Sequence, residues 1–114
     1  MSHRRRIAPV FALAVAAAAG AQEGAVEPAE AGRKIYINGC QRCHGIQLVS
    51  NGIGFDLRNF PQPEKERFVR SVTQGLRAMP AFGDSLKPEQ LDLIWLYIGA
   101  VNGWPVSEIG RAHV

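Results

Sequence analysis

The sequence is poor in several chemically informative residue types. Its 114 residues include two cysteines, two methionines and only three lysines, at positions 34, 65 and 87. Cys40 and Cys43 leave no second cysteine pair to complete a four-ligand zinc site. No segment alternates strictly between apolar and polar residues, which is the pattern of a half-buried β-strand. These absences argue against a β-sheet protein and against a zinc module of the usual composition.

The two cysteines lie in one motif, Cys40-Gln41-Arg42-Cys43-His44, with C-x-x-C-H spacing. This spacing is typical of covalent haem attachment. Two thiols a short turn apart can each add to a vinyl group on the same porphyrin edge, and the following imidazole can then bind the iron. Zinc binding or dithiol redox chemistry is the alternative. A disulfide across so short a loop would stabilise the fold little.

The N-terminal segment has the layout of an export signal. Three arginines at positions 4–6 precede an apolar, alanine-rich run from Ile7 to Ala19, and Ala19-Gly20-Ala21 matches a small-x-small cleavage pattern. The run is shorter than the ~20 residues that span a bilayer. We therefore expect residues 1–21 to be a signal peptide that directs the protein to the periplasm, with no stable membrane insertion after cleavage. The alternative is an uncleaved anchoring helix.

Cleavage would also remove the excess of positive charge. The full chain has 13 Lys and Arg against 10 Asp and Glu, and three of the arginines lie within residues 1–21. The remaining chain would carry ten charges of each sign. The basic character of the whole sequence therefore belongs to the signal segment and gives no reason to expect nucleic-acid binding.

The part that would remain after cleavage is long enough for one small domain. We expect a polar leader over residues 22–28, the domain over 29–104 and a flexible C-terminal tail over 105–114. The domain is predicted to be all-α, with three main helices over residues 27–39, 63–76 and 88–101. A covalently held porphyrin would serve such a small fold as a staple at its centre.

Helical periodicity supports the second and third helices. The apolar residues that recur at helical spacing are Phe68, Val69, Val72 and Leu76 in one and Leu91, Ile94, Trp95 and Ile98 in the other. Gly39 and Gly75 mark helix ends, and the stretches 45–59 and 77–86 read as irregular loops. The third helix lacks the usual hydroxyl or carboxylate N-cap, because Lys87 precedes its first residue, Pro88. Water or Ser85 would then have to cap the helix instead.

Met79 is the candidate for a second iron ligand. Met1 would be lost with the signal, so Met79 is the one methionine of the remaining chain. It lies in a loop directly before Pro80, which stiffens the backbone. The alternatives are that Met79 fills the core, or that His113 near the C-terminus binds the iron. Ligation by His44 and Met79 would fill both axial positions and favour electron transfer over binding of oxygen or peroxide.

Together these residues resemble a class I c-type cytochrome with one haem. In that family a small residue and an aromatic on the first helix cross the last helix, and Gly32 and Tyr36 stand at those positions. The resemblance also rests on Cys40, Cys43, His44, Met79 and the Ile94/Tyr97 pair. It covers about residues 29–104 and implies a helical bundle around covalently attached haem c, with His44 and Met79 as axial ligands.

The loop from Ser50 to Arg58 is similar to cytochrome domains that serve PQQ-dependent alcohol dehydrogenases. Those domains often read Gly-x-x-Pro-Asp-Leu-Arg, and here Phe55 occupies the proline position. In the wider family a carbonyl near that proline accepts a hydrogen bond from the proximal histidine, and Phe55 keeps such a carbonyl. Arg58 is either a partner of a haem propionate or an ordinary surface arginine.

The resemblance implies a monomeric, periplasmic one-electron carrier rather than an enzyme. The expected donor is a PQQ-dependent dehydrogenase, and the expected acceptor is an oxidase or another cytochrome. One alternative is a haem enzyme or a gas or peroxide sensor with a displaceable sixth ligand. Another is a cytochrome subunit bound tightly within a dehydrogenase complex.

Overall fold

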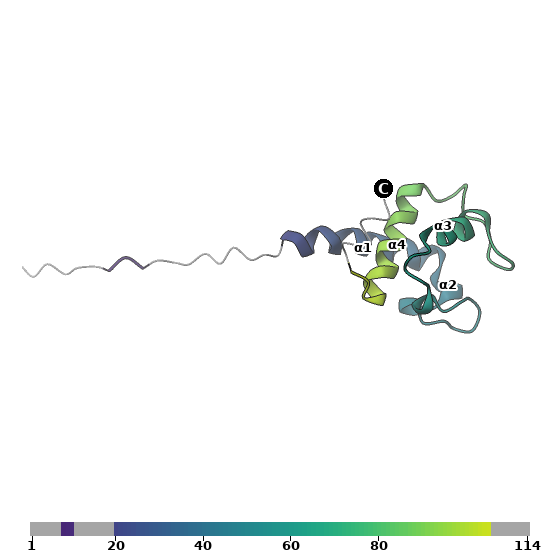
Figure 1. The fold of residues 1–114 in the computed structure, drawn as a ribbon, viewed down its shortest axis with the longest axis horizontal. Coiled ribbons are helices and arrows are strands. Elements are labelled where there is room, and N and C mark those ends of the chain that lie inside the picture. The colour runs from purple at the N-terminus through teal and green to yellow at the C-terminus, as the bar shows by residue number, and fades with distance from the viewer. Residues whose placement is uncertain (1–7, 11–19, 106–114) are drawn as a thin grey trace, which may run out of the picture.

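The computed structural model describes residues 8–10 and 20–105, with the side chains of the first helix described from Glu27 onward. Over these residues the structure contains helices and no β-strand, so the all-α prediction is confirmed (Figure 1). The α-helices are α1 (Gly20–Gly39), α2 (Gln41–His44), α3 (Lys65–Gln74) and α4 (Pro88–Asn102). Two short 3-10 helices, η1 (Ile46–Leu48) and η2 (Leu57–Asn59), lie in the loop before α3.

The N-terminal part of the domain differs from the expectation. α1 begins at Gly20 rather than at Glu27, so residues 22–28 are helical, in keeping with the high helix propensity of Glu23, Ala25 and Glu27. Pro28 consequently lies inside the helix, where it removes one backbone hydrogen bond. Most of the predicted signal peptide and tail lies outside the described residues, and both stay predictions. Of the helices described, none combines the length and apolar character that crossing a membrane requires.

α1 and α4 cross closely and form the largest helix contact of the described fold (Figure 1). Gly32 is buried at this crossing, where a Cβ atom would overlap the carbonyl oxygen of Leu93. Tyr36, one turn further along α1, is fully buried, and its ring centroid lies 5.2 Å from that of Tyr97 on α4. The small residue and the aromatic of α1 therefore meet the last helix, as the resemblance implies.

One hydrophobic core joins α1, α3 and α4. Trp95 is 1% exposed, and its ring centroid lies 5.1 Å from that of Phe68 on α3. The buried apolar residues of the described part are Tyr36, Leu48, Phe68, Val72, Leu91, Ile94, Trp95, Tyr97 and Ile98. The predicted apolar face of α4 is entirely among them. In the second predicted helix the pattern fails at Leu76, which lies beyond the end of α3 and is exposed.

The helix ends show how local sequence sets the boundaries. The backbone N–H of Lys87 donates to the side-chain oxygen of Gln90 at 2.9 Å, so Gln90 serves the start of α4. Ser85, one of the two expected caps, instead donates its hydroxyl to the carbonyl of Phe82. α3 ends before Gly75, whose φ of 77° is a conformation that glycine adopts without strain.

We expect replacement of Tyr36 by phenylalanine to lower the free energy of unfolding by about 1–2 kcal/mol at neutral pH. The buried Tyr36 hydroxyl donates to the carbonyl of Gly45, which would lose its partner. Burial also raises the pKa of Tyr36. The folded-state pKa then exceeds the unfolded value of about 10, so this contribution is complete below pH ~10 and is lost as the pH rises further. Urea unfolding of both proteins between neutral and alkaline pH measures the difference.

The control for this variant is Tyr97→Phe at neutral pH. Among the described residues the Tyr97 hydroxyl makes no hydrogen bond, although Tyr97 is also buried, with 7% of its surface exposed. A loss of stability as large in Tyr97→Phe as in Tyr36→Phe would show that the Gly45 bond is not the cause.

Candidate functional site

A pocket of about 640 Å³ lies between the C-x-x-C-H motif and the segment around Met79. This volume is within the range of about 300–1,000 Å³ typical of sites for small molecules and cofactors. Its walls are formed by Asn38, Gly39, Cys40, Arg42, Cys43 and His44, by Ile53, Gly54 and Phe55, and by residues 76–80 and Phe82. Four residues that the sequence predicts as site residues, Cys40, Cys43, His44 and Met79, are therefore brought together.

The C-x-x-C-H motif lies at the junction of α1 and α2. The N–H of Cys40 donates to the Tyr36 carbonyl at 2.8 Å, and the N–H of His44 donates to the Cys40 carbonyl at 2.9 Å. Both thiols are free, with Cys43 exposed and Cys40 half-buried. Burial raises the pKa of Cys40 to about 11, so its thiol is protonated at neutral pH. The motif thus presents two thiols and an imidazole along one short helical stretch.

The His44 ring forms a hydrogen bond with the loop that follows it in the sequence. Its Nδ1 lies 2.8 Å from the carbonyl oxygen of Phe55. A carbonyl oxygen only accepts, so Nδ1 carries the proton and Nε2 keeps its lone pair for a metal. The N–H of Gly54 donates to the Cys43 carbonyl at 2.7 Å, and the Ser50 hydroxyl donates to the Gly54 carbonyl at 2.6 Å. The histidine–carbonyl bond is therefore present although phenylalanine replaces proline in this loop.

Met79 is held in a two-residue turn. The N–H and carbonyl of Leu76 bond to the carbonyl and N–H of Met79, at 3.1 and 2.9 Å. After the turn, the N–H of Phe82 donates to the carbonyl of Val72 at 2.8 Å, and that of Gly83 donates to Thr73 at 3.1 Å. The Met79 side chain is half-buried and packs against the core. Backbone bonds on both sides therefore fix the methionine at the pocket.

Arg58 does not line the pocket. It lies on η2, and its guanidinium Nη2 is 2.6 Å from a carboxylate oxygen of Asp56, whose pKa is lowered by the hydrogen bonds from Arg58. Its role toward a propionate stays a prediction.

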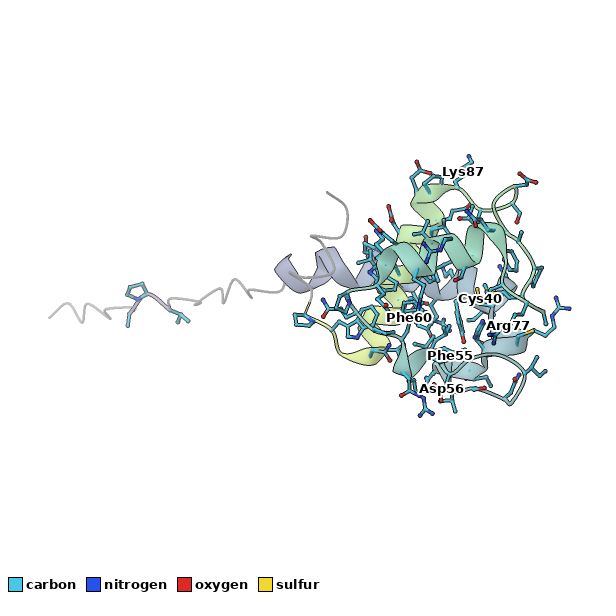
Figure 2. All side chains as sticks on the ribbon, turned by 45° about the vertical axis from the view of Figure 1, so that its right-hand side comes forward. Cys40, Phe55, Asp56, Phe60, Arg77 and Lys87 are labelled. Atoms are coloured by element: carbon cyan, nitrogen blue, oxygen red, sulfur yellow. The ribbon has the colours of Figure 1, made fainter. Side chains whose placement is uncertain are left out.

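Two arginines that the sequence analysis did not single out, Arg42 and Arg77, do line the pocket. The signal that could have identified them is their position, since Arg42 lies between the two cysteines of the motif and Arg77 is two residues before Met79. Figure 2 shows Arg77 near Cys40 and Phe55.

Comparisons with known proteins identify relatives of this chain. Residues 27–98 match the family described as cytochrome c oxidase, cbb3-type, subunit III. The quinohemoprotein alcohol dehydrogenase ADH IIB of Pseudomonas putida is 40% identical over 77 residues, 65% of this chain and 11% of that protein. ADH-IIG of the same organism is 43% identical over 72 residues, 60% of this chain and 10% of that protein. The chain thus spans about a tenth of the length of these two dehydrogenases.

A shorter relative is matched along nearly its whole length. Cytochrome c6 of Microcystis aeruginosa is 34% identical over 80 residues, 64% of this chain and 99% of that protein. No solved structure gives a significant match.

The pocket suits the cofactor of these proteins. Cytochromes c carry covalently attached haem c, and this chain has the two cysteines that the attachment requires. An imidazole with a free Nε2 and a thioether are present at the same pocket. The match over residues 27–98, the all-α fold and the pocket agree, and the chain belongs to the cytochrome c family.

Proposed function

We propose that this haem-based electron carrier works in the periplasm and that His44 and Met79 are the axial ligands of its single haem c. The observation that carries the proposal is the composition of the pocket. Cys40, Cys43 and His44 line it from one segment, and Met79 lines it from another segment 35 residues further along the chain. This is the donor set that two thioether links and His/Met ligation need.

The residues around the pocket have distinct tasks in this proposal. Bound haem supplies a one-electron couple between ferrous and ferric iron. Cys40 and Cys43 would hold the porphyrin edge, and the bond from His44 to the Phe55 carbonyl fixes the orientation and tautomer of the imidazole. The backbone bonds between Leu76 and Met79 hold the methionine at the same pocket. With His44 and Met79 both bound to the iron, no position would be left for oxygen or peroxide, and no substrate bond would be made or broken.

We expect Gly54→Ala to shift the haem reduction potential, on the order of 30 mV upward. An added Cβ would lie 2.8 Å from His44 Nδ1 and 2.8 Å from the Cys43 carbonyl, so the ring or the loop must move. A weaker bond to Phe55 makes the imidazole a poorer donor to the iron. Redox titration of the purified holoprotein measures the shift.

Gly52→Ala is the matched control for that change. Gly52 has a φ of 93°, so alanine at this position would strain the backbone of the same loop, but its Cβ would meet no atom within 4 Å. An equal shift in both variants would trace the effect to loop strain rather than to the histidine.

The proposed donor is a PQQ-dependent dehydrogenase, and the proposed acceptor is an oxidase or another cytochrome. The two quinohemoprotein alcohol dehydrogenases among the relatives support this donor. In each of them a stretch similar to this chain is joined, in one polypeptide, to the rest of a protein named as an alcohol dehydrogenase. The loop from Ser50 to Arg58 lies within the matched stretch and is similar to cytochrome domains that serve such enzymes.

The domain limits and the route of export belong to the same proposal. Residues 1–21 are proposed as a cleaved signal peptide and residues 29–104 as the cytochrome domain. N-terminal sequencing of the protein from the periplasmic fraction tests the cleavage after Ala21. A cytoplasmic haem protein that keeps its first residues would contradict it.

A second candidate is a cytochrome subunit held within a larger complex. The family description names an oxidase subunit, and two relatives contain the matched stretch within a much longer chain. Gel filtration of a native extract separates the two cases. Elution at the size of one small domain favours a diffusing, monomeric carrier, and elution with a dehydrogenase favours the subunit.

Stopped-flow mixing tests the carrier assignment. Ferric holoprotein is mixed with a purified PQQ-dependent dehydrogenase of the host and its alcohol. Reduction faster than turnover of the whole respiratory chain is the expected result. If every such dehydrogenase of the host leaves the protein ferric, the donor assignment is wrong, although a haem c spectrum would still support the cofactor.

A further inference from the structure

The loop after the C-x-x-C-H motif turns back and holds the backbone of the motif. α2 has only four residues, so its carbonyl groups find no partners further along the same helix. The N–H of Gly45 donates to the Gln41 carbonyl at 2.8 Å, and the N–H of Gly54 donates to the Cys43 carbonyl at 2.7 Å. The Arg42 carbonyl lies between these two in the sequence, and among the described residues no backbone N–H donates to it.

Asn51 supplies the missing donor with its side chain. Its Nδ2 donates to the Arg42 carbonyl at 2.7 Å. At the other end of the same carboxamide, Oδ1 accepts the N–H of Ile53 at 3.1 Å. A carboxamide can donate from one end and accept at the other without carrying a charge. Asn51 therefore joins the middle of the motif to the loop that returns toward His44.

Ser50 closes the same loop on itself. The N–H of Gly52 donates to the Ser50 hydroxyl at 3.1 Å, and this hydroxyl donates to the Gly54 carbonyl at 2.6 Å. Gly54 is followed by Phe55, whose carbonyl oxygen lies 2.8 Å from Nδ1 of His44. The loop that carries the hydrogen-bond acceptor of the histidine is thus braced internally by the serine and attached to the motif by the asparagine that follows it.

The bonds from this loop act on both peptide groups next to Cys43. The Arg42 carbonyl belongs to the peptide group before Cys43, and the Cys43 carbonyl belongs to the one after it. Holding both restricts the backbone rotations on either side of the cysteine, and so the directions in which the side chains of Cys43 and His44 leave the backbone. Asn51 itself is exposed and does not line the pocket, so it acts on these residues only through the backbone.

We propose that Asn51 is a positioning residue for the proximal iron ligand, because its carboxamide fixes the Arg42 carbonyl and keeps the Phe55 carbonyl on His44. The inference rests on the proposed ligation by His44. A hydrogen bond from the second ring nitrogen of a ligating histidine fixes the ring orientation and makes the imidazole a stronger donor. A looser loop weakens that bond, so the effect of Asn51 should be measurable at the histidine and not only in the stability of the fold.

Two substitutions at Asn51 separate its two hydrogen bonds. In Asn51→Ser the hydroxyl can still accept the N–H of Ile53, since serine forms the same kind of turn as asparagine. The shorter side chain cannot also reach the Arg42 carbonyl. Asn51→Ala removes both bonds. Neither variant adds a charge, and neither opens a cavity, because the side chain is exposed. Both should therefore loosen the motif to the same extent.

Asn102→Ala is the matched control. The Nδ2 of Asn102 also donates to a backbone carbonyl far away in the sequence, that of Leu57, at 3.1 Å. This bond joins the end of α4 to η2, and neither helix contributes a residue to the pocket. Its loss should lower the melting temperature and leave the properties of His44 unchanged.

NMR of the ferrous holoprotein labelled with nitrogen-15 histidine reports on His44 directly. His113 is the other histidine that remains after the proposed cleavage, so the spectrum has few signals to assign. We expect the Nδ1 proton of His44 to exchange with solvent about fivefold faster in both Asn51 variants, the change that loss of one hydrogen bond gives. The amide proton of Gly54 should show the same acceleration, and redox titration should show a higher reduction potential.

Two results would overturn the inference. If Asn51→Ser matches the unmodified protein while Asn51→Ala does not, the turn at Ile53 matters and the tie to Arg42 does not. If Asn102→Ala accelerates exchange at His44 as much as the Asn51 variants do, the cause is general loosening of the fold.

The histidine signals also distinguish failure of the inference from failure of the proposed function. If the ring signals of His44 are shifted by the haem, and the Asn51 variants match the unmodified protein in exchange and potential, the inference alone is wrong. If the haem shifts no ring signal of His44 in the unmodified protein, the proposed ligation is wrong, and the inference falls with it.

Discussion

Replacing Met79 with alanine is expected to lower the haem reduction potential by on the order of 100 mV and to let the ferrous protein bind carbon monoxide. A methionine thioether raises the potential, and axial ligands as a class move haem potentials over about 0.8 V. Alanine has no donor atom, so the sixth position would pass to water or to an added ligand. The absorption band of ferric iron bound to sulfur, at the red end of the spectrum, should vanish.

The matched control is Leu86→Ala. Leu86 is half-buried, packs against the same core and follows Met79 in the same loop, but it does not line the pocket. Its truncation should lower stability and leave the potential, the band and carbon monoxide binding unchanged. Redox titration and absorption spectra of the three proteins provide the comparison.

An unchanged spectrum in Met79→Ala would contradict the ligand assignment. The remaining candidate from the sequence is His113, which lies outside the described residues, and His113→Ala in the same background would test it. If instead the unmodified protein already binds carbon monoxide readily, the sixth position is open. A haem enzyme or a gas or peroxide sensor would then explain the site better than an electron carrier.

Replacing Gly32 with alanine is expected to lower the free energy of unfolding by about 3 kcal/mol. The added methyl group would overlap the backbone carbonyl of Leu93, and a backbone atom cannot move aside as a flexible side chain can. α1 and α4 must therefore separate, which loosens the packing around Tyr36 and Trp95. For a domain of this size the melting temperature should fall by about 12 °C or more.

Lys34→Ala is the control within the same helix. Lys34 is exposed and does not line the pocket. Alanine and lysine are both good helix formers, so this variant should be as stable as the parent or nearly so. Thermal melts of the two holoproteins give the test. Near-equal melting temperatures would mean that the close crossing at Gly32 is not needed for stability.

The sequence predicts α4 within one residue because two independent signals coincide there. Pro88 starts the helix, Leu91, Ile94, Trp95 and Ile98 repeat at helical spacing, and all four are buried. α1 is predicted well only at its end, where Gly39 precedes the motif. The sequence predicts its beginning at Glu27, whereas α1 begins at Gly20. Proline favours the first turn of a helix but can also lie within one, and local signals do not decide between the two.

The pocket could be predicted in part. The C-x-x-C-H spacing identifies Cys40, Cys43 and His44 from five consecutive residues, and the scarcity of methionine points to Met79. That Arg77 also reaches this pocket depends on the turn between Leu76 and Met79, for which the sequence has no glycine signal. The pairing of Arg58 with Asp56 likewise depends on the folded loop. Side chains whose position follows from loop geometry are the ones that sequence patterns miss.

The bonds from Phe82 to Val72 and from Gly83 to Thr73 tie the methionine segment to the last turn of α3. Segments that share backbone bonds tend to open and close as one cooperative unit. α3 contributes no side chain to the pocket, yet loosening of its last turn would release the methionine segment. The lifetime of the sixth ligand on the iron would then be set by the fraying of a helix that never touches the haem pocket.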